Sequence, residues 1–128
     1  MRALDTNVVV RYLTGDNPAQ ATRARAAVDA GPVFVPVTVL LESEWVLRSS
    51  YGLVEKAAVE ALRRFAGLRN VSVENAKLVV EAFDRAEEGM DFADALHLGA
   101  AGNCDAMLTF DRKFIRMAGG APIGVMEP

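Results

Sequence analysis

The sequence contains one cysteine, Cys104, and one histidine, His97, among its 128 residues. A single cysteine excludes an intrachain disulfide framework and a zinc site built from cysteines, so we expect a protein of the reducing cytoplasm. No apolar run approaches the ~20 residues that a membrane span requires, and Asp5 comes too early for a signal peptide. We therefore expect no membrane segment.

Positive charge is not in excess, since 14 Lys and Arg residues stand against 17 Asp and Glu residues. The formal net charge of −3 argues against a broadly basic nucleic-acid binder, although it does not exclude a nuclease. Hydrophobic residues make up 52% of the chain and charged residues 24%, as is typical of a globular protein rather than a disordered one. A chain of this length can bury roughly two thirds of its unfolded surface. Because repeats and internal linkers are absent, we predict one domain over residues 1–128.

Several catalytic motifs are missing. The chain has no phosphate loop of the Gly-x-x-x-x-Gly-Lys type and no Gly-x-Ser-x-Gly turn. His97 has no evident nucleophile to serve, and we interpret it as a packed residue or one that supports a neighbouring site. A phospho-acceptor domain would need paired amino-terminal acids and a late lysine, to which only Asp5 and Lys113 loosely correspond. The sequence therefore disfavours a P-loop nucleotide-binding protein, a serine hydrolase and a phospho-acceptor signalling domain.

Short apolar runs alternate with helical patterns along the chain. Strands are predicted at residues 2–4, 33–37, 71–73, 106–108 and 123–125. Helices are predicted at residues 8–13, 19–30, 39–50, 54–66, 75–88 and 112–117, with one more that is capped by Asp91 and runs to Gly102. The β-branched run at 8–10 also suits a strand, but a cap at Asp5 or Thr6 favours helix, and Thr38 is the expected cap of the helix at 39–50. This alternation predicts an α/β fold with a parallel sheet.

Acidic residues stand where strands end or helices begin. Asp5 and Asp111 follow short strands, Asp94 lies in the first turn of a helix, and Glu42 lies one turn inside the helix after the strand at 33–37. Sites in parallel sheets gather beyond the carboxyl ends of the strands. Carboxylates that meet there repel one another unless a cation neutralises them. Oxygen ligands without clustered His or Cys indicate Mg²⁺, with Mn²⁺ as a substitute, which activates water for attack on a phosphodiester.

Each of these acids also has a purely structural interpretation. Asp91 and Asp94 fit a capping box, and Asp111 alone fits a helix cap. These interpretations stay open at the level of the single residue.

Two acids lie close together in the helix at 39–50. Glu44 has Arg48 four residues on, which favours a surface ion pair. Glu42 shares an apolar helical face with Val39 and Val46, where a carboxylate needs a cation or a hydrogen-bond donor. The spacing favours Glu42 as the site residue without deciding between the two.

Four short motifs follow one another along the chain: Asp5-Thr6-Asn7, Glu42 with Trp45-Val46-Leu47 and Tyr51-Gly52, Asp91-Phe92-Ala93-Asp94-Ala95-Leu96, and Thr109-Phe110-Asp111. In this order they resemble the motifs of PIN domains, specifically of VapC-type toxin ribonucleases. The resemblance runs almost end to end. It implies a three-layer α/β/α fold around a central, mostly parallel sheet of four to five short strands, and it selects Glu42 over Glu44.

The resemblance also implies roles for individual residues. Asp5 and Asp94 would be the central ligands of one or two Mg²⁺ ions, Asp111 a ligand nearer to solvent or of a second metal, and Glu42 a ligand or the acid that orients the attacking water. The residues that match positions supporting this catalytic site are Thr6, Asn7, Asp91 and Thr109.

The implied activity is that of an RNA endonuclease, and the implied partner is a VapB-type antitoxin whose tail blocks the active cleft. Family members are commonly homodimers. A PIN nuclease of RNA processing without a toxin role, and an inactive PIN-fold interaction module, remain as alternatives. The RNA target and the roles of Glu44 and His97 stay open.

Overall fold

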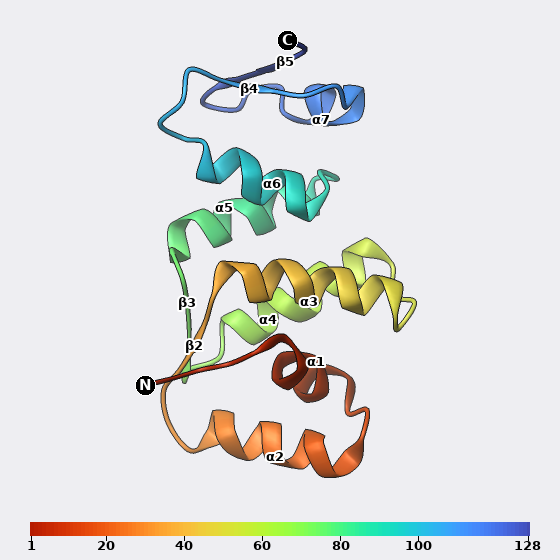
Figure 1. Ribbon diagram of the computed structural model, residues 1–128, viewed down its shortest axis with the longest axis vertical. Helices are drawn as coiled ribbons and strands as arrows, with labels where there is room; N and C mark the ends of the chain where they lie inside the picture. The colour runs from red at the N-terminus through yellow and green to blue at the C-terminus, as the bar shows by residue number, and fades with distance from the viewer. The chain divides into compact units, whose positions relative to one another are not determined.

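Five strands and seven helices alternate along the computed structural model, which describes residues 1–128 (Figure 1). The strands are β1 (Arg2–Ala3), β2 (Val33–Val35), β3 (Val71–Val73), β4 (Ala106–Leu108) and β5 (Gly124–Met126). The helices are α1 (Thr6–Thr14), α2 (Pro18–Asp29), α3 (Val37–Ser49), α4 (Glu55–Ala66), α5 (Ala76–Glu87), α6 (Phe92–Ala100) and α7 (Arg112–Met117). All strand pairs are parallel, which confirms the predicted α/β class. None of the helices has the length and apolar character needed to cross a bilayer.

The chain divides into two compact units, an N-terminal unit of Met1–Ala76 and a C-terminal unit of Lys77–Pro128. The N-terminal unit contains the three-stranded sheet with the order β1-β2-β3, and the C-terminal unit contains the pair β4-β5. Five parallel strands are present, within the predicted number of four to five, but their hydrogen bonds form a three-stranded and a two-stranded sheet instead of the one central sheet that was predicted. That residues 1–128 form one domain stays a prediction.

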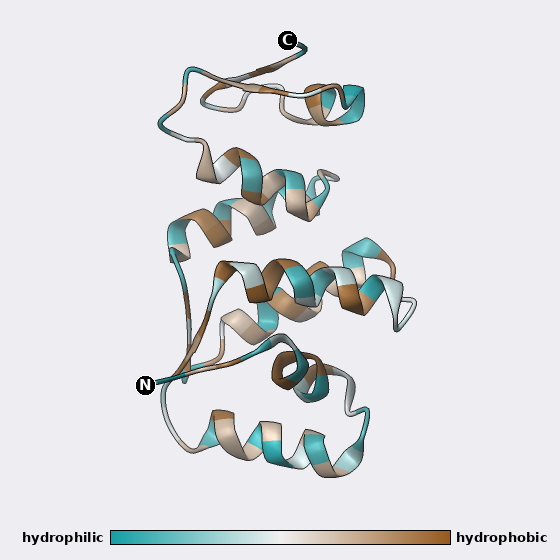
Figure 2. Ribbon diagram, viewed as in Figure 1, coloured by the Kyte–Doolittle hydropathy of each residue, from teal (hydrophilic) through white to brown (hydrophobic).

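In the N-terminal unit, helices α1 and α2 connect β1 to β2, and helices α3 and α4 connect β2 to β3. Strand β2 is central, and its Val33 and Val35 are fully buried. It is drawn in brown along its length in Figure 2, as expected for a strand with neighbours on both sides. Helix α1 packs against α2 and α3. The strands are parallel, so the start of α1 and the start of α3 follow the same edge of the sheet.

The β-branched segment after β1 is helical, as predicted, because its first turn is capped. Asp5 is the N-cap, and its Oδ1 accepts a hydrogen bond from the backbone N–H of Thr6 at 2.8 Å. At the other end Gly15 adopts φ 70°, a left-handed conformation that suits glycine and ends the helix. Strand β2 ends at Val35 and so is two residues shorter than the predicted range of 33–37, because Pro36 has no backbone N–H to continue the ladder.

The predicted cap of α3 is wrong. This helix begins at Val37, so Thr38 lies inside its first turn, and Pro36 at the N-cap position makes no side-chain hydrogen bond. Instead, the backbone N–H of Val37 donates to Oε1 of Glu74 at 2.8 Å. Glu74 follows β3, and its carboxylate takes the place of a local cap because β3 is parallel to β2 and ends beside it.

In the C-terminal unit, both predicted helix caps are confirmed. Asp91 accepts a hydrogen bond from the backbone N–H of Asp94 at 3.1 Å, and Asp111 accepts one from the backbone N–H of Phe114 at 3.1 Å. The apolar run Ala106–Leu108, which suits a buried strand, is not buried: its first two residues are half-buried, and Leu108 is 57% exposed. Strand β4 pairs only with β5, so one of its edges has no neighbouring strand.

Candidate active site

In the N-terminal unit two of the predicted acids, Asp5 and Glu42, are hydrogen-bonded to one residue, Thr6. Thr6 donates its backbone N–H to Asp5 and its hydroxyl hydrogen, from Oγ1, to Oε1 of Glu42. Thr6 itself is buried. Because it bonds to both carboxylates, Thr6 links the end of β1 to the second turn of α3. The supporting role predicted for Thr6 stays a prediction, and these two hydrogen bonds are the contacts through which it could act.

Asp5 and Glu42 line a cavity of about 430 Å³. Asn7, Arg11 and Tyr51 lie in its wall as well. Both acids are exposed, and neither forms an ion pair. Two carboxylates without a neutralising partner in one cavity attract a cation, which would relieve their mutual repulsion.

The two acids of α3 have exchanged environments relative to the sequence prediction. Glu42 is exposed in the cavity, whereas Glu44 is 2% exposed and pairs with Nε of Arg48. The predicted Glu44–Arg48 ion pair is confirmed, but its assignment to the surface is wrong. Glu44 lies on the buried face of α3 with Leu40 and Leu47, and the arginine neutralises its charge there.

This difference predicts opposite outcomes for two matched substitutions. Glu44→Gln keeps the size of the side chain but removes the charge that Arg48 neutralises, and we expect a loss of about 1–3 kcal/mol in the free energy of unfolding. Glu42→Gln can still accept the Thr6 hydrogen bond, so stability should change by less than about 0.5 kcal/mol, while the affinity of the cavity for a divalent cation should fall about tenfold or more. Urea denaturation and calorimetric titration of both variants with Mn²⁺ measure these effects. The assignment of Glu42 to the site is wrong if Mn²⁺ binds the folded Glu42 variant as tightly as it binds the native chain.

The cavity lined by Asp5 and Glu42 is the acid cavity. Arg11 lies in its wall and is held there by a network of hydrogen bonds. Its Nη1 donates to the hydroxyl of Tyr51 at 2.9 Å, and its Nε donates to Oε1 of Gln20 at 3.0 Å. The Tyr51 hydroxyl donates in turn to Oδ2 of Asp16 at 2.8 Å. That hydrogen bond, with smaller contributions from the backbone N–H of Asn17 and the charge of Arg11, lowers the pKa of Asp16. Asp16 therefore stays ionised as a partner of the network.

No motif of the sequence singles out Arg11 as a site residue. Asn7 and Arg11 are four residues apart on α1 and line the same cavity as Asp5. The helical spacing that places them together is visible in the sequence. What could not be seen there is the contact with Tyr51, which lies 40 residues away.

The C-terminal unit contains the other two predicted acids. Asp94 lines a cavity of about 580 Å³ together with His97 and Thr109. Asp111 is the exposed cap of α7, and its backbone N–H donates to Oγ1 of Thr109 at 3.0 Å. Thr109 also donates its own N–H to the carbonyl of Met126, so it links the segment before α7 to the end of β5. His97 is exposed, and its interpretation as a packed residue is wrong.

The donor set of the acid cavity fits a hard divalent cation. No group of three or more His, Cys, Asp or Glu side chains that could hold a metal ion is present, and Asp5 and Glu42 form a pair. Mg²⁺ is usually held by one or two carboxylates and completes its octahedral shell with waters and substrate phosphates. An all-oxygen pair without thiolate or imidazole suits Mg²⁺ or Mn²⁺ better than zinc.

Comparison with known proteins gives one family. The family model described as PIN domain matches residues 2–120, and no curated protein matches the chain. The match spans both units and includes all four predicted acids. PIN domains are typically nucleases, which hydrolyse phosphodiester bonds. The chain, with Asp5 after β1 and Glu42 in the helix that follows β2 of a parallel sheet, belongs to the PIN domain family.

Proposed function

We propose that the protein is a Mg²⁺-dependent RNA endonuclease of the VapC type, the toxin of a type II toxin–antitoxin pair. The observation that supports this proposal is the acid pair Asp5 and Glu42, exposed in one cavity, bridged by Thr6 and free of ion pairs. Two exposed carboxylates that share a cavity without an ion pair repel each other, and a bound cation would relieve that repulsion.

Each residue of the cavity has a role in this proposal. Asp5 and Glu42 would hold Mg²⁺, or Mn²⁺ in its place. The bound ion supplies a polarised water and stabilises charge on the phosphate. Thr6 fixes one oxygen of Glu42, which leaves Oε2 to accept a hydrogen bond from the attacking water and to orient it. Arg11, already aligned by Tyr51, places a guanidinium at the rim, where it can contact a phosphate oxygen.

Asp94 and Asp111 belong to the proposed catalytic set because their motifs resemble those of the family. The N–H contacts around them are consistent with a defined local geometry: Asp91 fixes the first turn of α6, and Thr109 fixes the segment that leads into α7. Each of the two acids has to be tested by its own substitution.

We extend the proposal to partners and location on the same resemblance. The substrate is RNA, the inhibitory partner is a VapB-type antitoxin whose tail blocks the active cleft, and the protein is a cytoplasmic homodimer. Arrest of growth on induction, and its reversal by a co-expressed antitoxin, would distinguish the toxin from an RNA-processing nuclease. Light scattering on the purified protein measures the oligomeric state.

The test of the proposed activity is cleavage of end-labelled RNA by the purified chain with Mg²⁺, with Mn²⁺ and with EDTA. We expect endonucleolytic products with either metal and a loss of more than about a hundredfold with EDTA, because the acid pair alone cannot activate water at neutral pH. Undiminished cleavage in EDTA would contradict metal dependence. An absence of cleavage together with no Mn²⁺ binding by calorimetry would instead favour the inactive interaction module.

A further inference from the structure

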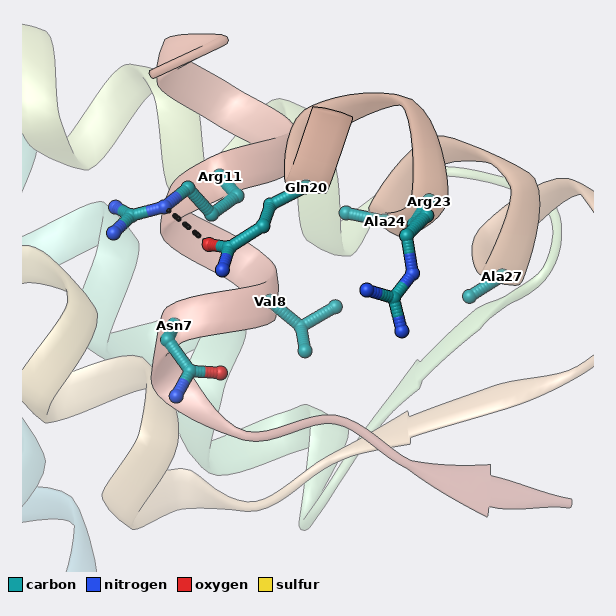
Figure 3. A pocket seen from close by; sticks show the side chains of 7 residues that line it. All are labelled: Asn7, Val8, Arg11, Gln20, Arg23, Ala24 and Ala27. Atoms are coloured by element: carbon teal, nitrogen blue, oxygen red, sulfur yellow. Dashed lines mark hydrogen bonds between the residues drawn. The ribbon is translucent and has the colours of Figure 1, made fainter. Parts of the chain in front are cut away.

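A second cavity of the N-terminal unit lies between α1 and α2 and has a volume of about 520 Å³ (Figure 3). Asn7, Val8 and Arg11 line it from α1, and four residues line it from α2: Gln20, Arg23, Ala24 and Ala27. Those α2 positions follow the spacing of a single helical face. Alanine at two of them keeps the cavity open where the two helices pack together.

The polar groups that line this cavity are amides and guanidinium groups, and no acid is among them. Gln20 turns its side-chain oxygen toward Nε of Arg11, as the dashed line in Figure 3 shows. Its amide nitrogen, a donor, is therefore left for other partners. Arg23 is exposed and forms no ion pair or hydrogen bond with the rest of the chain. A cavity lined by an unpaired guanidinium and amide donors, with no carboxylate, suits an anion.

The α1–α2 cavity adjoins the acid cavity, because Asn7 and Arg11 line both. Asp5 and Glu42 line only the acid cavity, and Arg23 lines only the α1–α2 cavity. A chain-like ligand that occupied both cavities would therefore meet the two acids in one and Arg23 in the other. From the acid cavity to the α1–α2 cavity, the charge of the lining side chains changes from acidic to basic, although the whole chain has a net charge of −3.

We propose that the α1–α2 cavity binds the phosphodiester backbone of the substrate strand beside the scissile bond, with Arg23 as the side chain that contacts a phosphate. This inference rests on the proposed nuclease function and adds a subsite to it. A strand with regularly repeated phosphates fits two adjoining cavities of opposite charge, because one phosphate can lie at the acid pair with its cation while the next meets the guanidinium of Arg23.

The test measures binding separately from cleavage. Fluorescence anisotropy in EDTA gives the Kd of the full chain for a labelled 2′-O-methyl RNA strand, for the native sequence, Arg23→Ala and Arg25→Ala. Arg25 is the matched control, because it is an exposed arginine on the same helix that does not line the cavity. We expect Arg23→Ala to raise Kd about three- to tenfold and to reduce the slope of log Kd against log salt by about 0.7, the value for one lost phosphate contact on a single strand.

The Arg25 variant should bind as the native chain does. A dinucleotide substrate, too short to reach Arg23, should be cleaved equally by all three proteins with Mg²⁺, whereas a longer strand should show a higher KM for Arg23→Ala alone. If the native chain cleaves RNA and both arginine variants bind it equally well, the subsite is refuted and the nuclease proposal stands. If the native chain neither cleaves nor binds RNA, both proposals fail. Competition by an acidic peptide that depends on Arg23, without competition by RNA, would assign the cavity to a protein partner and overturn the inference.

Discussion

Replacing Asp5 with asparagine is expected to lower the rate of RNA cleavage by more than about a hundredfold while the chain stays folded. Asparagine is as good an N-cap as aspartate, so the amide oxygen can still accept the backbone N–H of Thr6 at the start of α1. What the substitution removes is one of the two negative charges in the acid cavity, and with it the attraction for a divalent cation. Single-turnover cleavage and thermal melting of the same preparation measure the two effects.

The control for this experiment is Asp5→Ala, which removes both the charge and the cap. It should be as inactive as Asp5→Asn and should lose a further ~0.5–2 kcal/mol of stability. Equal loss of activity with unequal stability would separate the charge of Asp5 from its structural role. Activity retained in Asp5→Asn would contradict the proposed site. Asp94→Asn is expected to cause a loss of activity of the same order.

Replacing Phe92 with alanine is expected to destabilise the protein by about 3–5 kcal/mol. Phe92 is fully buried, and its ring stacks on that of Phe83 with centroids 5.3 Å apart and an angle of 15° between the planes. Alanine would leave a cavity and remove this ring contact at the first residue of α6. We expect the melting temperature to fall by roughly 10–20 °C.

Phe110→Ala is the matched control, because Phe110 is 78% exposed in the same unit. Its removal should change stability by less than about 0.5 kcal/mol. Calorimetry or urea denaturation of both variants measures the difference. A melting temperature for Phe92→Ala equal to that of the control would show that the aromatic core of the C-terminal unit is wrongly assigned.

Much of the fold could be predicted from the sequence because the relevant interactions are local. The caps at Asp5, Asp91 and Asp111 act within three residues, and glycine after α1 ends that helix through its backbone conformation alone. The strand before Pro36 also ends for a local reason, the missing N–H of proline. The positions of most helices follow from such features.

The predictions that the structure contradicts depend on contacts between residues far apart in the chain. Glu74 caps α3 from 37 residues away, so the sequence around Thr38 gave no indication of it. Glu44 and Glu42 are two positions apart on one helix, and only the packing of α3 in the N-terminal unit determines which of them is buried. Leu108 is apolar yet 57% exposed, and an apolar side chain in a short strand does not by itself indicate which face of the strand other elements cover.

In the candidate site, too, motif positions could be predicted from the sequence, whereas contacts between distant residues could not. Motif resemblance identified Asp5 and Glu42, but nothing in the sequence indicated that one threonine would bond to both, since Thr6 and Glu42 are 36 residues apart. The network of Arg11, Tyr51 and Asp16 was likewise beyond prediction, because it depends on how the end of α3 meets the loop after α1.

The Thr6 bridge has a consequence for how the site responds to heat or denaturant. Asp5 and Glu42 are both hydrogen-bonded to one residue, Asp5 to the backbone N–H of Thr6 and Glu42 to its hydroxyl, so fraying of the first turn of α1 would displace both charges in one event. Helix ends open at a lower free energy than the core does. Cation affinity should therefore decline in advance of global unfolding, at temperatures where the sheet is still intact.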